Sequence, residues 1–309
     1  MEKFAQQLAN GVTLGSVYAL VALGYTMVYG IIGLINFAHG EVVMIGAMVA
    51  TAIAAALAVA HPGMAPAIVF GLCLLLAIPV CMGVGWTAER IAYRPLRKAP
   101  RLSTLITAIG VSIILQNGAM MIWGRNYLNF PRVVEPVVYG IGSVRINSVQ
   151  LVIILIAAAI MASLLVLVHR TRLGVAMRAT AQNREVAGLM GINIDTVISS
   201  AFLVGSALAA VAGLMISVYY GVVNYYMGFM LGLKAFTAAV LGGIGNLGGA
   251  MLGGVLLGVI EALASGYVGD LTGGFMGSHY QDVFAFVVLV LVLIVRPAGL
   301  LGERVGDRA

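Results

Sequence analysis

The feature that most limits the fold of this chain is a series of apolar stretches, each long enough to cross a lipid bilayer as a helix. The clearest is LVIILIAAAIMASLLVLV, residues 151–168, which contains no charged residue. A spanning helix needs about 20 mostly apolar residues, and in lipid only helices and closed barrels satisfy every backbone hydrogen bond. We therefore expect an all-α, polytopic integral membrane protein. The candidate spans are 8–30, 41–60, 64–87, 102–123, 149–169, 196–217, 233–268 and 281–296.

The composition agrees with this expectation. The chain is 61% hydrophobic and 9% charged, its mean hydropathy is +1.06, and a soluble domain carries about 25% charged residues. Its 40 glycines also fit, because glycine lets transmembrane helices pack closely. The net charge of +6 bears on membrane topology and gives no reason to expect a nucleic-acid partner. We expect one transmembrane domain over residues 1–309, in contact with membrane lipid.

Two of the apolar regions are interrupted by glycines. The run 233–268 is too long for one span and contains GGIGNLGGAMLGG, so we interpret it as a short half-span followed by a full span. The second interruption is IIGLINFAHGE, which separates the first two spans and has the character of a re-entrant break. With these breaks the chain should contain eight or nine spans.

Basic residues indicate the orientation, because cytoplasmic loops carry an excess of Lys and Arg. They gather in the loop after the third span, in the loop after the fifth span and in the tail. We place these regions and the C-terminus in the cytoplasm, and the loops 124–148 and 269–280 outside. By parity the N-terminus lies outside, unless IIGLINFAHGE is a re-entrant break. The stretch VRINSVQ alternates and suggests that loop 124–148 forms a small ordered cap, although a plain connector fits equally well.

A polar island, RATAQNREVAGLMGIN at 178–193, lies between two of the most apolar spans. Residues 174–191 fit one short helix, with Val175, Ala179, Val186 and Leu189 on one side. We expect the helix to stop at its glycines and Asp195 to cap the next span. Such a helix could lie on the bilayer surface. The narrow, alanine-rich apolar stripe suits a protein groove better.

Three motifs carry a resemblance to a known family. EVAGLMG, residues 185–191, resembles the Glu-Ala-Ala, three residues, Gly core of the coupling loop in ABC importer permeases. The longer island, together with residues 10–41 and KAFTAAVLGGIGNLGGAMLGG at 234–254, is similar to the H-type permease subunits of high-affinity branched-chain amino acid ABC importers. The chain departs from the general motif downstream, where SAFLVG replaces an isoleucine and Leu-Pro. The resemblance covers nearly the whole chain.

The resemblance implies an ABC importer permease fold in the bacterial inner membrane. Its partners would be two ABC ATPase subunits, a second homologous permease subunit in a heterodimer, and a periplasmic solute-binding protein that does most of the substrate selection. The coupling loop, about 170–195, would form a short cytoplasmic helix seated in a cleft of the ATPase. The residues assigned to this coupling are Arg178, Arg184, Glu185, Ala187 and Gly191. Permeases for urea or another small solute are a near alternative to branched-chain amino acids.

The chain contains no motif for binding ATP itself. A phosphate-binding loop needs Gly-Lys before Ser or Thr, and none of the three lysines follows a glycine. The four histidines lack metal-site spacing, and no nucleophile elbow occurs. We expect no enzyme activity, metal or cofactor, with ATP bound by the partner subunits. An ion-coupled secondary transporter is the main rival, but Glu41, Glu261 and Asp282 would make a thin relay. An accessory scaffold subunit would leave the glycine breaks without a use.

The broken spans also supply the candidate pathway residues. Polar groups at membrane depth are costly unless they face protein or water. These residues therefore either line the route, or form hydrogen bonds with unpaired backbone groups or with neighbouring helices. The candidates are Asn36, His39, Glu41, Gln116, Asn117, Gly242, Gly243 and Asn246. We expect the two glycine breaks to face each other across the route, and Lys234 to extend toward the membrane surface.

Overall fold

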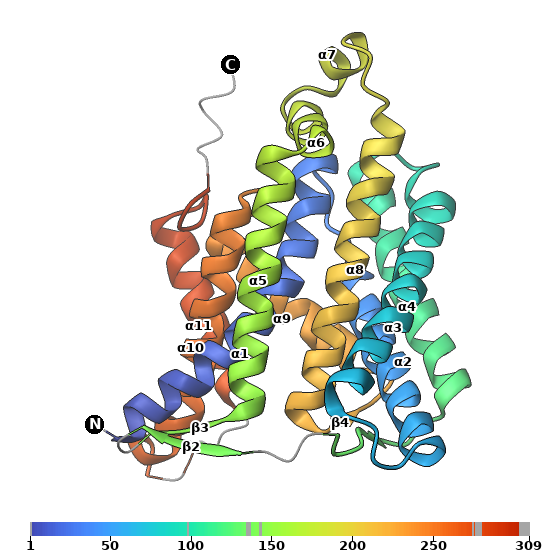
Figure 1. Ribbon diagram of the computed structural model, residues 1–309. Helices are drawn as coiled ribbons and strands as arrows, with labels where there is room; N and C mark the ends of the chain where they lie inside the picture. Colours follow the sequence, from blue (N-terminus) through green and yellow to red (C-terminus); the bar gives the residue numbers. More distant parts are fainter. Residues whose placement is uncertain are drawn as a thin grey trace.

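The computed structural model describes residues 2–97, 99–133, 137–141, 144–273, 275 and 280–302, and it is a bundle of tilted helices (Figure 1). Within this part, seven helices are long and apolar enough to cross a membrane, and two further apolar helices are shorter. The long ones are α1 (Glu2–Ile32), α2 (His39–Ala60), α3 (Pro66–Ala88), α4 (Arg101–Trp123), α5 (Ser148–Arg170), α8 (Ile194–Tyr220) and α10 (Leu247–Leu271). The shorter ones are α9 (Met227–Gly242) and α11 (Gln281–Val295). The prediction of a polytopic all-α membrane protein is confirmed, while the exact number of spans stays a prediction.

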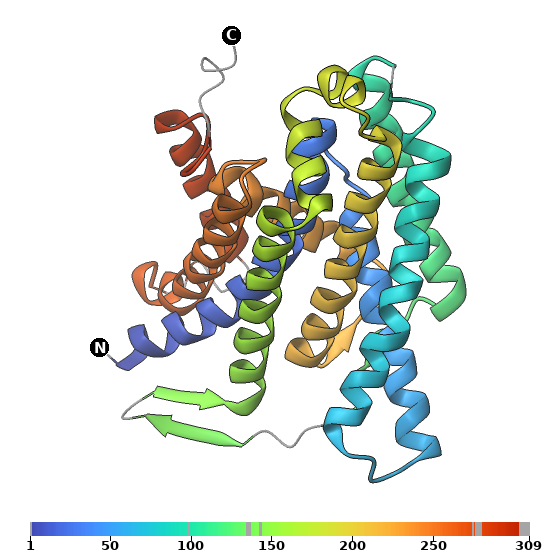
Figure 2. The same cartoon turned by 45° about the horizontal axis from the view of Figure 1, so that its top comes forward.

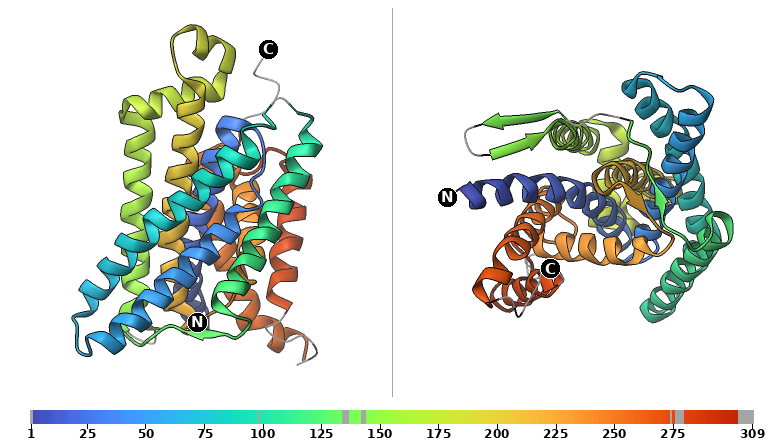
Figure 3. Two further views of the ribbon diagram at one scale, coloured as in Figure 1. Left: turned by 90° about the vertical axis from the view of Figure 1, so that its right-hand side faces the viewer. Right: turned by 90° about the horizontal axis from the view of Figure 1, so that it is seen from below.

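Helix α1 occupies the centre of the bundle, and its middle is almost completely buried. On one side it contacts α9 and α10, which α11 covers, and on the other it contacts α5 and α8. Helices α2 and α3 pack against α8, and α4 contacts α2 at the edge of the molecule. The view from below shows α1 running between these two groups (Figure 3). The most buried helix is therefore also the one that joins the two halves.

Glycines allow α1 and α10 to pack backbone against backbone. A side chain at Gly15 would come within 2.7 Å of the Cα of Val255, and one at Gly258 would overlap the backbone of Gly15. Gly254 lies against the backbone of Ala19 in the same way. Lipid supplies no hydrophobic drive for helix association, so such close van der Waals contact is what holds membrane helices together.

Both predicted breaks are present. Helix α1 ends at Ile32 and α2 begins at His39, which leaves residues 33–38 outside any helix. Gly33 starts this segment with φ +67, and its N–H donates to the carbonyl of Tyr29 (2.7 Å). Residues 243–246 separate α9 from α10, as the interpretation of 233–268 as a half-span and a full span required. Gly243 and Gly245 both have positive φ, a conformation that favours glycine.

Two small antiparallel sheets lie at one end of the bundle. Strands β2 (Val138–Ile141) and β3 (Val144–Asn147) form a hairpin, visible as the green arrows in Figure 2. Strand β1 (Leu128–Asn129) pairs with β4 (Val222–Val223). Residues 144–147 of the alternating stretch form β3, which agrees with the ordered cap, and residues 148–150 begin α5. Residues 134–136 and 142–143 of this loop lie outside the described part. Gln6 of α1 exchanges two hydrogen bonds with the backbone of Arg145 (2.8 and 2.9 Å), which attaches the hairpin to the bundle.

The two ends of the bundle differ in charge. The turn after α3, the start of α4, the short helices α6 (Arg172–Gln182) and α7 (Arg184–Leu189), and the end of α11 lie at one end (Figure 1). The hairpin and the start of α1 lie at the other. The described arginines of the first end are Arg90, Arg94, Arg97, Arg101, Arg170, Arg172, Arg178, Arg184 and Arg296. The three predicted basic regions therefore share one side, although Lys98, Arg304 and Arg308 lie outside the described residues.

The α1–α10 contact leads to a first prediction. Gly258→Ala should lower the stability of the folded protein by about 1–3 kcal/mol, the usual cost of overpacking a close contact. The matched control is Gly83→Ala on the exposed face of α3, where a side chain would meet nothing within 4 Å. The measurement is the melting temperature of the detergent-solubilised protein. Equal melting temperatures for the two variants would contradict the packing argument.

Candidate functional site

The polar island forms two short helices instead of the single helix expected over 174–191. These are α6 (Arg172–Gln182) and α7 (Arg184–Leu189). The correction has a local cause. The side chain of Asn183 accepts a hydrogen bond from the N–H of Val186 (3.1 Å), so it caps a new helix and ends the old one. We call residues 172–191 the coupling segment.

The coupling segment folds back tightly from the end of α5. The Thr171 hydroxyl donates to the carbonyl of Leu167 (2.6 Å) and accepts from the N–H of Gly174 (3.1 Å). A side chain at Gly174 would overlap the carbonyls of Leu167 and Val168. This turn fixes where α6 starts relative to the membrane-spanning part of α5.

Two of the predicted coupling residues, Arg178 and Arg184, hydrogen-bond to the ends of membrane-spanning helices. The guanidinium of Arg178 donates to the carbonyl of Val168 near the end of α5. Arg184 donates to the carbonyl of Ile31 at the end of α1, through Nε (3.1 Å) and a terminal nitrogen (2.7 Å). The last carbonyls of a helix have no partner within the helix, and basic side chains can supply one. The two arginines thus attach the coupling segment to α5 and α1.

The exposed surface of the coupling segment is partly apolar. Leu189 is 87% exposed and Met190 is 79% exposed, and Val175 and Val186 are also exposed. Glu185 is exposed as well, whereas Ala187 is buried. Gly191 takes a positive φ of +85 where the segment turns back, as its predicted role in a helix stop required. The segment stands clear of the membrane bundle (Figures 1 and 3), so this surface is available to another protein.

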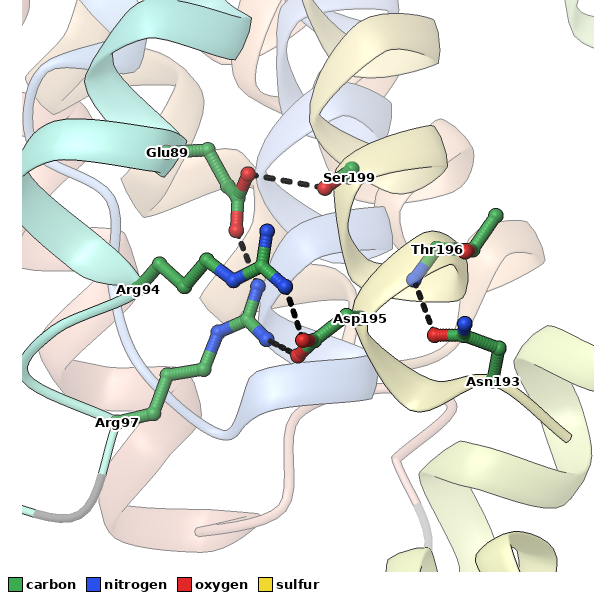
Figure 4. Close-up of polar contacts among 7 residues, drawn as sticks. All are labelled: Glu89, Arg94, Arg97, Asn193, Asp195, Thr196 and Ser199. Carbon is green, nitrogen blue, oxygen red and sulfur yellow. Dashed lines mark hydrogen bonds and ion pairs between the residues drawn. The ribbon is translucent and has the colours of Figure 1, made fainter.

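Asn193 caps α8, because its side chain accepts a hydrogen bond from the N–H of Thr196 (3.1 Å). The expectation that Asp195 caps this helix is therefore wrong. The Asp195 carboxylate instead pairs with Arg94 and Arg97, and Arg97 also pairs with the fully buried Glu89. Figure 4 shows this cluster, in which Glu89 also accepts from the Ser199 hydroxyl (2.9 Å).

The Asp195 cluster joins the start of α8 to the end of the third span. That span closes with a π-helical turn, η1 (Glu89–Tyr93). Burial, and next the charge of Arg97, lower the pKa of Arg184, so this charge cluster also reaches the coupling segment.

The first break gathers three predicted pathway residues in buried positions. The Asn36 carboxamide oxygen accepts from the Tyr93 hydroxyl (2.6 Å). His39 is 2% exposed, and its ring fits against Gly24 and meets Tyr25 edge-on (4.9 Å between centroids). Sequence reasoning missed Tyr93, because nothing in the local sequence connects it to a residue 57 positions earlier.

Glu41, in the first turn of α2, is also buried. One of its carboxylate oxygens accepts from the Ser112 hydroxyl of α4 (3.1 Å). The other lies against Gly228 of α9, where only a glycine leaves room for it. Gly40 likewise lies against the backbone of Gly228 and Gly232. A larger residue at Gly40 would therefore separate α2 from α9.

The second break is closed by the chain's own C-terminal segment. The N–H groups of Leu300 and Leu301 donate to the carbonyls of Leu241 and Gly242 (both 2.9 Å). Asn246 caps α10 by accepting from the N–H of Gly249 (3.0 Å) and donates to the carbonyl of Leu301 (2.9 Å).

This closure changes what a substitution at the second break would do. Gly243 lies against the backbone of Gly302, so bulk at Gly243 would displace the C-terminal segment. A side chain at Gly30 would come within 3.7 Å of Gly245, so the two breaks lie near each other. A shared route between them stays a prediction.

Gln116 and Asn117 lie on α4 at the edge of the bundle. Asn117 is exposed, and its amide donates to the carbonyl of Ile113 in the same helix (2.8 Å). Gln116 is half-buried, one turn beyond the buried Ser112 that contacts Glu41. Among the described residues, Asn117 therefore bonds only within its own helix. A pathway role for either residue stays a prediction.

Lys234 is buried in an ionic cluster, which corrects the expectation that it extends to the membrane surface. Its ammonium lies 2.7 Å from Asp282 and 3.2 Å from Glu261. Glu261 also accepts from the Tyr18 hydroxyl (2.8 Å). The cluster joins α1, α9, α10 and α11. Glu261 and Asp282 therefore share Lys234 as a partner. From the sequence, these two acids are too few for an ion relay, and their pairing with a lysine was not predicted.

The Lys234 cluster supplies a second prediction. Lys234→Met should reduce stability by about 3–5 kcal/mol, because removing one partner leaves buried carboxylates without a counter-charge. The control is Lys3→Met, which breaks an exposed pair with Asp270 and should change stability little. Melting temperatures of the purified proteins provide the measurement. A Lys234→Met variant as stable as the Lys3→Met variant would disprove the inference that the cluster holds α11 in place.

Comparisons with known proteins give a consistent result. Residues 7–293 match the family model described as branched-chain amino acid transport system / permease component. The chain is 47% identical over 310 residues to the high-affinity branched-chain amino acid transport system permease protein LivH of Escherichia coli (strain K12), covering 97% of this chain and 96% of that protein. It is 46% identical over 304 residues to the corresponding permease protein BraD of Pseudomonas aeruginosa, with the same coverage. No solved structure matches this chain.

Proposed function

This chain belongs to the family of permease components of branched-chain amino acid transport systems, and we propose that it carries branched-chain amino acids across the inner membrane as one subunit of an ATP-driven importer. The observation that carries the proposal is the coupling segment. It stands beyond the membrane helices at the arginine-rich end, with Leu189 and Met190 exposed. Apolar side chains presented on a short helix are suited to a groove in a partner protein.

The partner proposed for this surface is an ATPase subunit. The chain has no Gly-Lys sequence for a phosphate-binding loop of its own, so the energy must come from elsewhere. We propose the complete importer to contain two ATPase subunits, a second homologous permease and a periplasmic binding protein. Substrate selection would rest mainly on the binding protein.

The proposed orientation places the coupling segment and the C-terminal segment in the cytoplasm. The excess of arginine at that end supports it, because basic loops are retained on the cytoplasmic side. The hairpin β2–β3 and the N-terminus would then face the periplasm, where the binding protein delivers substrate.

Reconstitution in proteoliposomes tests the proposal. The permease, its paralogous partner, the ATPases and the loaded binding protein should together take up branched-chain amino acids when ATP is supplied. Uptake that follows a proton or sodium gradient without ATP would support the secondary-transporter alternative instead. If urea is taken up in preference to leucine, the protein is still an ATP-driven importer but its substrate is not a branched-chain amino acid.

A third prediction concerns the surface of the coupling segment. Leu189→Gln should weaken ATPase binding, because it removes an apolar contact from the proposed interface. Glu185→Lys should do so by reversing a charge there, and both variants should still insert in the membrane. The controls are Val59→Gln, at a site 85% exposed at the other end of the molecule, and Glu2→Lys at the exposed start of α1. Co-purification of the ATPases and uptake rates are measured. Wild-type values for both coupling variants would refute the assignment.

A fourth prediction concerns orientation. A cysteine in place of Gln182 should resist a membrane-impermeant thiol reagent in intact cells, whereas one in place of Tyr139 should react. Both positions are exposed, and the native Cys73 and Cys81 are buried, so the background should be low. Labelling of the Gln182→Cys variant from outside would reverse the proposed topology.

A further inference from the structure

The segment between α1 and α2, residues 33–38, is held at its two ends by different cytoplasmic elements. At its first end, α1 finishes with the carbonyl of Ile31 bonded to the Arg184 guanidinium. Arg184 is the first residue of α7. Any movement of α7 therefore acts directly on the end of α1, two residues before Gly33.

At its second end, the segment is held by Tyr93. The Tyr93 hydroxyl donates to Asn36 (2.6 Å), and both side chains are buried, at 4% and 7% exposure. The Tyr93 ring packs against Phe202 of α8 (5.3 Å between centroids). A hydrogen bond in such a place is stronger than one in water, and its loss is correspondingly more costly.

Tyr93 is itself tied to the coupling segment. It ends the π-helical turn η1, and such turns occur often at functional positions in helices. Arg94 and Arg97 follow it and pair with Asp195 (Figure 4). Asp195 lies in the first turn of α8, six residues after the end of α7. Both anchors of the segment thus lead back to α7 and the start of α8.

The segment also has the features of a hinge. Gly33 has positive φ, is exposed and has no neighbour in reach of a side chain, so rotation there meets little resistance. Below it, the His39 Nε2 atom and one oxygen of Glu41 are buried without hydrogen-bond partners among the described residues. Unsatisfied buried polar atoms are costly, and a displaced segment would let water or substrate reach them.

We propose that residues 33–38 form a movable gate at the cytoplasmic end of the route, and that Tyr93 is a positioning residue that latches this gate through Asn36. The inference rests on the proposed function. Displacement of the coupling segment by the ATPase reaches the gate through the Arg184–Ile31 contact, and through the Asp195 cluster and Tyr93. Opening requires the Tyr93–Asn36 bond to break, and closing reforms it.

The test uses the complete importer in proteoliposomes, with uptake and ATP hydrolysis measured together. Tyr93→Phe removes only the hydroxyl and keeps the ring against Phe202. ATP hydrolysis should continue, while the number of substrate molecules imported per ATP falls about threefold to tenfold, the effect of one buried hydrogen bond on a two-state equilibrium. Asn36→Ala should behave alike, and the double variant should be no worse than either single one.

The matched control is Tyr127→Phe, which removes a tyrosine–tyrosine hydrogen bond at the opposite end of the molecule. Its transport ratio should equal that of the wild type. A purely structural role for Tyr93 would lower the melting temperature and leave the ratio unchanged, and that result would overturn the proposal. So would additive effects of Tyr93→Phe and Asn36→Ala.

A second measurement follows the gate itself. A cysteine replacing Leu34 should react with a thiol reagent at rates that differ severalfold between the nucleotide-free and ATP-trapped complexes. Tyr93→Phe should abolish that difference, and a cysteine replacing Val59 should show none. Equal rates at Leu34 in both states would rule out the gate. If the wild-type complex shows no ATP-driven uptake, the proposed function and the latch are both wrong. If the wild-type complex shows ATP-driven uptake and the variants have the same transport ratio as the wild type, only the latch is wrong.

Discussion

Every interruption of a membrane helix exposes backbone groups that lipid cannot satisfy, and the way this chain satisfies them determines how its functional parts are connected. The end of α1 is closed by Arg184 and the end of α5 by Arg178. The end of α9 is closed by the N–H groups of Leu300 and Leu301. In each case the group that completes a helix comes from a segment at the arginine-rich end of the bundle. The hydrogen bonds that the bilayer makes necessary therefore also connect these helix ends to segments at that end of the bundle.

The coupling segment shows what this arrangement permits. Arg178 and Arg184 bond to α5 and α1, while Glu185 and apolar side chains such as Leu189 are exposed. If the exposed surface binds the proposed partner, the two arginines remain free to hold the segment to the bundle. The attachment leads to α1, which is the most buried helix and packs through glycines against α10. A small shift at the coupling segment is therefore applied at the centre of the bundle and not at its edge.

Charged groups inside the bundle serve a different purpose. Lys234 pairs with both Glu261 and Asp282 where α9, α10 and α11 meet. Arg94 and Arg97 pair with Glu89 and Asp195 at the arginine-rich end of the bundle. Buried charges are tolerated only when paired, so each cluster fixes the relative position of several helices. The contacts around Asn36 are neutral by comparison, and neutral hydrogen bonds are easier to break and reform.

The sequence by itself determined the spans, the division of 233–268 at its glycines, the gathering of basic residues at one end and the place of the coupling segment. Each of these depends on local composition, because lipid penalises every polar residue according to its depth. Only the tertiary structure decided the inward direction of Arg178 and Arg184, the helix break at Asn183, and the partners of Asp195 and Lys234. It alone brought Tyr93 to Asn36, 57 residues away. The reason is that lipid and protein interior are equally apolar, so an apolar helix does not reveal which face meets a neighbour, and pairs between distant residues depend on that choice.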